Sequence, residues 1–250
     1  MPVSILIVRA LLAGLAAPAA APAHVPAPPA PYPFAVGETL SYDAKLGYFP
    51  VGTATASVGR AQEQGSEAFV FAFSGAGGPP GVRVQYDLTS WTRSARFASL
   101  RFHRKLVQGN SVEEERYQIV PDSSRYRLEG GGQDWVAPRD ALDELAFMYY
   151  LRTAPLESGR TYTISRYFRS GYNPITVRVT GRESVTLYDN SSVPCFVVEV
   201  STRGTTLRLR LTDDARRLPV QLELPLSFGT VSLELSGVST APGSSRSPTG

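Results

Sequence analysis

Apolar and polar side chains alternate along most of this chain. The segment GVRVQYDLTS places Val82, Val84, Tyr86 and Leu88 on one face and mostly charged or amide side chains on the other, and ITVRVTGR, TLRLRL and VSLELSG repeat the pattern. A period of two is typical of strands with one face on a core and one face in water. Clusters of Gly, Pro, Asn and Asp separate these runs, as turns require. The pattern predicts an all-β fold in which about ten to twelve antiparallel strands form a curved sheet, either a barrel or a half-barrel.

One stretch, PRDALDELAFMYYLRTAPLESG, departs from the alternation. Leu142, Leu145 and Tyr149 recur in it at helical spacing, so it predicts one helix over about residues 140–152. Asp140 can cap the start of this helix. We expect the helix to pack its apolar stripe against the concave face of the sheet, because no second helix is predicted.

The two ends of the chain differ in composition from the part between them. Residues 1–23 combine an apolar run with small residues and an A-x-A match ending at Ala23, which is typical of a cleaved export signal. A retained membrane anchor is the alternative, although the run is shorter than the roughly 20 residues that a membrane span needs. The sequence therefore predicts export to the periplasm or outer envelope, without a transmembrane helix after cleavage.

Domain boundaries follow from the same change in composition. Residues 24–33 are rich in Ala and Pro, which favours an extended spacer. Residues 239–250 are polar and rich in Ser, Pro and Gly, so we expect a disordered tail. A single β-rich domain is then expected over residues 34–238, a length that one domain can fill.

Composition and charge exclude several classes of function. The formal net charge is +3, and the arginines are interleaved with Asp and Glu rather than gathered in a block, so no nucleic-acid partner is expected. Cys195 is the single cysteine, which excludes an intramolecular disulfide, and it lies in an apolar run where a core position is expected. His103 and Cys195 are too few to build a zinc site. No metal and no cofactor is predicted.

The adjacent pair Asp213 and Asp214 raises the question of acid–base catalysis. The two residues lie in TDDARR, between two alternating runs, and Thr and Asp favour a turn by accepting bonds from nearby backbone amides. Paired acid catalysts usually need two separated carboxylates across a cleft. The pair is therefore interpreted as the polar tip of a hairpin, and no catalytic residue is predicted.

Three stretches together resemble a known family. They are FAVGETLSYDAKLGYFPVGTATASV with its G-E-x-L-x-Y, DALDELAFMYYLRTAPLESGRTY with D-x-L-x-x-x-Y-Y-L-R, and LTDDARRLPVQLE with D-D-x-R-R-x-P-V. In this order the chain is similar to the bacterial exported family called domain of unknown function 3108. The resemblance implies an exported, mostly β protein of the cell envelope. It implies no reaction, substrate or catalytic residue.

Three hypotheses for function remain open at this stage. The first is a non-enzymatic binding or carrier module for a lipid or other hydrophobic ligand, because a curved sheet with one helix against it can enclose an apolar cavity. Its candidate ligand-binding residues, which alternatively only fill the core, are Phe69, Phe71, Phe73, Tyr149, Tyr150 and Arg152. The second is a structural or assembly protein that binds another envelope protein or a glycan through its loops. The third is a carboxylate-based hydrolase, for which the candidate residues are Asp140, Glu144, Asp213 and Asp214.

Overall fold

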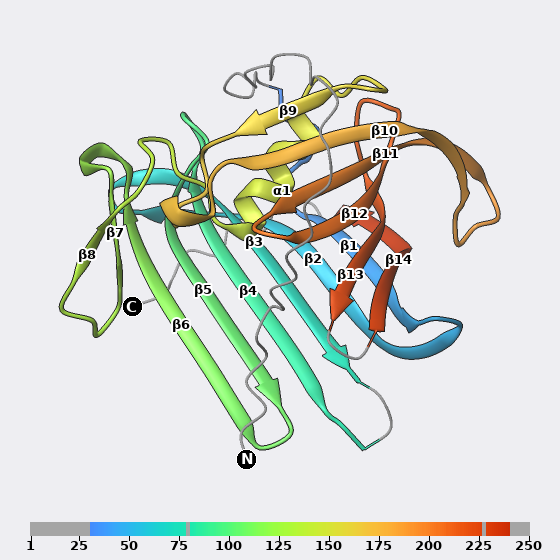
Figure 1. The fold of residues 1–250 in the computed structure, drawn as a ribbon, viewed down its shortest axis with the longest axis horizontal. Helices are drawn as coiled ribbons and strands as arrows, with labels where there is room; N and C mark the ends of the chain where they lie inside the picture. Colours follow the sequence, from blue (N-terminus) through green and yellow to red (C-terminus); the bar gives the residue numbers. More distant parts are fainter. Residues whose placement is uncertain (1–30, 79–80, 227–228, 241–250) are drawn as a thin grey trace.

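The fold is one antiparallel sheet wrapped around a single α-helix (Figure 1). The structure, a computed structural model, describes residues 31–78, 81–226 and 229–240. The all-β prediction with one helix is confirmed. The sheet has 14 strands, more than expected. One of them, β8, has only three residues, too few to show a clear alternation.

The first half of the chain forms eight strands in a simple meander. Their bounds are β1 (Glu38–Leu46), β2 (Phe49–Glu63), β3 (Ser66–Gly77), β4 (Val84–Arg93), β5 (Ala98–Gln108), β6 (Ser111–Val120), β7 (Arg125–Leu128) and β8 (Asp134–Val136). A short 3-10 helix, η1 (Pro121–Ser123), connects β6 to β7.

The second half forms a further six strands after the helix α1 (Glu144–Thr153). Their bounds are β9 (Thr161–Ile164), β10 (Ile175–Thr186), β11 (Ser192–Thr202), β12 (Thr205–Thr212), β13 (Pro219–Leu226) and β14 (Gly229–Thr240). A second 3-10 helix, η2 (Ser170–Tyr172), precedes β10.

The two meanders join where the last strand returns to the first. The strand order is β8-β7-β6-β5-β4-β3-β2-β1-β14-β13-β12-β11-β10-β9, with β1 paired to β14 from Glu38↔Thr240 to Leu46↔Val231. The outer strands β8 and β9 are not hydrogen-bonded to each other, so hydrogen bonds do not close the barrel. In Figure 1 the green strands and the orange and red strands form two walls, with α1 between them.

The helix begins four residues later than the sequence pattern suggests. Asp143, rather than Asp140, is its N-cap, and the Asp143 carboxylate accepts a hydrogen bond of 3.0 Å from the amide of Ala146. Leu142 fits the helical spacing but instead forms a parallel bridge with Tyr167. The amide of Leu142 donates to Arg166 O at 2.6 Å. This contact with the chain after β9 holds the residues before Asp143 in an extended conformation.

Aromatic rings pack closely where α1 meets β3. The rings of Phe71 and Tyr149 stack with centroids 3.9 Å apart, and Phe34 contacts both rings edge-on. Leu145, on the predicted apolar stripe, is buried in the same cluster. The predicted packing of the helix against the sheet is therefore confirmed.

The fold extends slightly past both expected boundaries. Tyr32, inside the expected spacer, donates a hydrogen bond of 2.7 Å to Ser94 O and stacks on Phe34. At the other end β14 continues to Thr240, two residues into the expected tail, because β1 provides a partner strand. The predicted export signal and most of the spacer and tail lie outside the described residues.

Candidate ligand-binding site

Four of the aromatic ligand-binding candidates lie in the filled core. Phe69 and Phe71 on β3 are buried, as are Tyr149 and Tyr150 on α1. Burial raises the pKa of Tyr149 well above its usual range. Only Phe73, further along β3, is half-buried. This placement favours the interpretation that these four rings stabilise the fold, and it leaves Phe73 as the aromatic candidate that a ligand can reach.

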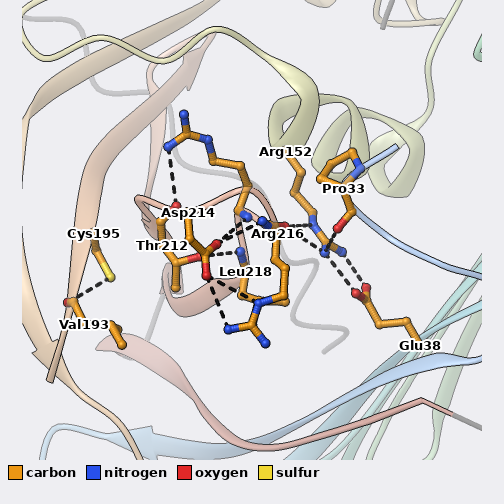
Figure 2. Close-up of polar contacts among 10 residues, drawn as sticks. Pro33, Glu38, Arg152, Val193, Cys195, Thr212, Asp214, Arg216 and Leu218 are labelled. Atoms are coloured by element: carbon orange, nitrogen blue, oxygen red, sulfur yellow. Dashed lines mark hydrogen bonds and ion pairs between the residues drawn. The ribbon is translucent and has the colours of Figure 1, made fainter. Parts of the chain in front are cut away.

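Arg152, the charged candidate, is the centre of a buried polar network (Figure 2). Its guanidinium donates to both carboxylate oxygens of Glu38, at 2.6 and 3.0 Å, and to Pro33 O at 3.0 Å. It also donates to Arg216 O from two nitrogens, at 3.0 and 3.3 Å. Arg152 is only 3% exposed and Glu38 only 7%. A guanidinium with these partners is a structural clamp rather than a free anion-binding group.

The same network joins the three sequence stretches that carry the family resemblance. Glu38 belongs to G-E-x-L-x-Y, Arg152 to the helix motif, and Arg216 to the D-D-x-R-R turn. The clamp therefore ties the start of β1, the end of α1 and the β12–β13 turn together at one end of the barrel. Pairs separated by 114 and 64 residues along the chain meet here.

The interpretation of Asp213 and Asp214 as turn residues is confirmed. Asp214 accepts hydrogen bonds from the amides of Arg216 and Arg217, at 3.0 and 3.1 Å, and from the Thr212 hydroxyl at 2.7 Å. Hydrogen bonds from these groups hold the pKa of Asp214 below its usual range, although partial burial opposes them. The Asp214 carboxylate therefore stabilises the turn.

Asp213 has two cationic partners of its own, one in the turn and one on β10. Its carboxylate lies 3.0 Å from the Arg217 guanidinium and 3.2 Å from that of Arg182. The remaining acidic candidates are also engaged. Asp140 forms an ion pair of 3.1 Å with Arg96, and Glu144 accepts a hydrogen bond from the Tyr167 hydroxyl.

The carboxyl with the most perturbed titration is Asp143. Burial raises its pKa to about 7, against hydrogen bonds from Ser90 and the Ala146 amide. A raised pKa often marks a catalytic acid. Asp143 is fully buried and acts as the helix cap, so substrate cannot reach it, and the perturbation is a consequence of structure.

Cys195 lies in the core, as expected. It is fully buried, and its thiol approaches Val193 O at 3.6 Å (Figure 2). Burial raises the pKa of this thiol to about 11. A protonated, inaccessible thiol is a poor nucleophile and metal ligand.

Apolar side chains on the inner face of the sheet are buried near α1 and only half-buried toward one end of the barrel. On β3 the series runs from buried Phe69 and Phe71 to half-buried Phe73, and on β12 it runs from buried Leu211 and Leu209 to half-buried Leu207. The other half-buried apolar residues at this end of the inner face are Tyr86 on β4, Leu106 on β5, and Leu222 and Leu224 on β13. All of them lie near the turns that end β1, β3, β5, β11 and β13.

Charged side chains also lie on this inner face. Arg104 on β5 falls between the inward positions of Phe102 and Leu106, and it forms an ion pair with Glu115 on β6. Arg169 donates to the same carboxylate at 3.0 Å and also bonds the Tyr117 hydroxyl. These groups lie between the filled core and the half-buried apolar residues.

Glu144 faces the same cluster from the first turn of α1. One carboxylate oxygen accepts a hydrogen bond of 2.7 Å from the Tyr167 hydroxyl, and the other is buried without a partner in the described residues. Burial and the nearby Glu144 charge raise the pKa of Tyr86 to about 12. The inner polar cluster, defined as Arg104, Glu115, Tyr117, Glu144, Tyr167 and Arg169, can bind the polar end of a molecule whose remainder is apolar.

Sequence reasoning missed this cluster, although a signal was available. On β5 the alternation places Leu100 and Phe102 inward, so Arg104 falls on the apolar face. On β6 the carboxylate of Glu115 shares a face with Tyr117 in the same way. A charge on the apolar face of an alternating strand is the observation that indicates such a site.

Two pockets include residues of β6 and β7 in their lining. The larger, of about 420 Å³, includes Arg101, Gln118 and Arg127 in its lining, and the smaller, of about 160 Å³, shares some of these residues. Arg101 and Gln118 point away from the core, opposite buried Phe102 and Tyr117. Neither pocket includes any of the six predicted ligand-binding residues.

Among the residues that the structure describes, no helix is long and apolar enough to cross a membrane. Within the same residues, no group of three or more His, Cys, Asp or Glu side chains is arranged to hold a metal ion.

The comparisons with known proteins address the family and the fold. No curated protein matches the chain. A solved structure, the crystal structure of a β-barrel-like protein of domain of unknown function DUF1849 from Brucella abortus, is similar at a TM-score of 0.60 and 12% sequence identity, over 83% of this chain and 98% of that one. At this identity the likeness supports the barrel-like fold alone. The family profile described as protein of unknown function (DUF3108) matches residues 41–236, and the chain belongs to that family.

Proposed function

We propose that this protein is an exported, non-enzymatic binding or carrier module of the cell envelope, and that its ligand is a lipid or another hydrophobic molecule. The observation that carries the proposal is the incomplete cover of the inner face. Inward apolar side chains on β3, β4, β5, β12 and β13 are half-buried at one end of the barrel, whereas their neighbours near α1 are buried. Apolar groups on an inner sheet face that the protein's own core does not cover favour an apolar ligand.

The inner polar cluster narrows the class of ligand. The cluster's two arginines and two carboxylates lie among its two tyrosines, one buried and one half-buried, next to Leu106 and Phe73 rather than in open solvent. A polar cluster beside exposed parts of apolar side chains suits an amphiphile, which would place its polar end at the cluster and its apolar part along the half-buried side chains. The unpartnered oxygen of Glu144 favours a polar end that carries a hydrogen-bond donor.

A titration with a fluorescent apolar probe, N-phenyl-1-naphthylamine, tests the proposal. We expect saturable binding by the wild-type protein and displacement of the probe by a single-chain amphiphile. Leu106→Gln should weaken binding by about tenfold, since loss of one well-buried apolar contact costs about 1.4 kcal/mol or more.

Val107→Gln provides the matched control. Val107 neighbours Leu106 on β5 and faces outward by alternation, so this variant should bind as the wild type does. Thermal melts of both variants show whether either change unfolds the protein. Absence of saturable binding by a folded wild-type protein, or equal effects of the two variants, would argue against an inner-face site.

A further inference from the structure

Four hairpins end at the same edge of the barrel. They join β1 to β2, β3 to β4, β5 to β6 and β13 to β14, and the strand ends that they join appear along the lower and right-hand side of Figure 1. Hydrogen bonds link neighbouring turns, from the Gly78 amide to Val51 O at 2.8 Å and from the Gly109 amide to Arg83 O at 2.9 Å. Leu46 pairs with Val231, next to the β13–β14 turn. The described residues of these turns, which exclude 79–80 and 227–228, are here called the hairpin edge.

Exposed apolar side chains concentrate on the hairpin edge. Of the six large hydrophobic residues that are exposed in the described chain, four lie there: Tyr48 at 98% exposed, Phe49 at 76%, Val112 at 59% and Val82 at 39%. Tyr48 and Phe49 are adjacent at the tip of β1–β2 and are followed by exposed Pro50. Neighbouring exposed aromatic rings with further apolar side chains beside them are typical of a surface that binds a partner.

The shape of the hairpin edge favours a bilayer over a protein partner. Tyr48 and Phe49 project from a tip and are open on nearly all sides, whereas a protein partner would need a matching pocket for each ring. A bilayer interface accepts Tyr and other aromatic rings without a preformed pocket. Arg83 on the next turn is exposed and forms no ion pair in the described chain, which suits an anionic headgroup.

The hairpin edge is also the end toward which the inner face loses its cover. Phe73, Leu106 and Leu224 lie within a few residues of the turns that form it. A surface that docks on a bilayer at this edge would bring the half-buried inner face close to the lipid.

We propose that the hairpin edge docks onto a lipid bilayer, with Tyr48 and Phe49 inserted at the interface. The contact is peripheral and reversible, because only a few apolar side chains take part. It does not depend on a ligand at the inner face, so vesicle binding and probe binding can succeed or fail independently.

Vesicle co-sedimentation of the full chain tests this docking. The vesicles are phosphatidylcholine alone or phosphatidylcholine with phosphatidylglycerol. The variant Tyr48→Ser with Phe49→Ser should bind at least about tenfold more weakly than the wild type, since each buried aromatic ring contributes about that factor or more. The matched control is Tyr188→Ser, because Tyr188 is also an exposed tyrosine but lies in the β10–β11 turn. It should bind as the wild type does.

Tryptophan fluorescence tests whether the tip of the β1–β2 turn itself enters the bilayer. Phe49→Trp should show a blue-shifted emission with vesicles and be quenched by brominated lipid, measured as the difference from wild type, whereas Tyr188→Trp should show neither change. A tip tryptophan that stays in water overturns the proposal, as does equal vesicle binding by the double variant and the wild type. If the wild type self-associates without vesicles and the double variant does not, the hairpin edge binds a second copy of the chain. That result would also overturn the proposal of bilayer docking.

Discussion

The buried pair of Arg152 and Glu38 supports the sharpest prediction on stability. Replacing Arg152 by Met keeps much of the side-chain volume but removes every hydrogen bond to Glu38, to Pro33 O and to Arg216 O. The Glu38 carboxylate, only 7% exposed, then remains as an uncompensated buried charge. Breaking one partner of such a pair costs about 3–5 kcal/mol. For a domain of this size the melting temperature should fall by about 6–20 °C, at about 2–4 °C per kcal/mol.

The assay is urea and thermal unfolding of a double-mutant cycle. Arg152→Met combined with Glu38→Gln should be more stable than Arg152→Met alone, because the second change removes the stranded charge. Arg60→Met is the control, since Arg60 and Glu67 form an exposed pair of 3.6 Å, and exposed pairs contribute about 0–1 kcal/mol. If Arg152→Met lost no more stability than Arg60→Met, the clamp would not hold the three segments together.

The remaining predictions concern the helix and the chain terminus. Leu145→Ala should lower the free energy of unfolding by about 2–5 kcal/mol, as large-to-small core changes do, whereas no loss in urea unfolding would mean that α1 is not packed. Glu144→Ala should cost about 1 kcal/mol through its lost bond to Tyr167, and a neutral effect in the same assay would refute that contact. Burial raises the pKa of folded Asp143 to about 7, above the unfolded value, so folding binds a proton. The stability that Asp143 contributes at pH 4 should therefore decline as the pH rises through 7. In Asp143→Asn this dependence of the free energy of unfolding on pH should disappear. On export, the signal should be cleaved near Ala23. An intact mass that still includes residues 1–23, measured on protein from a Gram-negative host, would contradict this prediction.

The local parts of this fold could be predicted from the sequence, whereas its long-range pairings could not. Alternation identified the strands, and the spacing of Leu145 and Tyr149 identified the helix, because both are properties of neighbouring residues. The start of the helix depends on the bridge between Leu142 and Tyr167, a contact that local spacing does not encode. The three residues of β8 are likewise too few to show a period.

In the candidate site, too, local features could be predicted from the sequence and long-range partners could not. Arg152 was identified as a candidate for ligand binding from its place in the helix, but its partner Glu38 lies 114 residues away along the chain. The inner polar cluster was missed, although Arg104 interrupts the apolar face of its strand. Burial also distinguishes Phe73 from Phe69 and Phe71, which alternation alone treats as equivalent, because cover depends on what packs against each position.

Native mass spectrometry of the protein purified from the cell envelope tests the central claim most directly. We expect a discrete added mass of lipid or another hydrophobic molecule that is lost on denaturation and reduced in Leu106→Gln, but not in Val107→Gln. A bare chain mass for the folded wild type, in preparations that also fail to bind the apolar probe, would contradict a carrier function for the inner face.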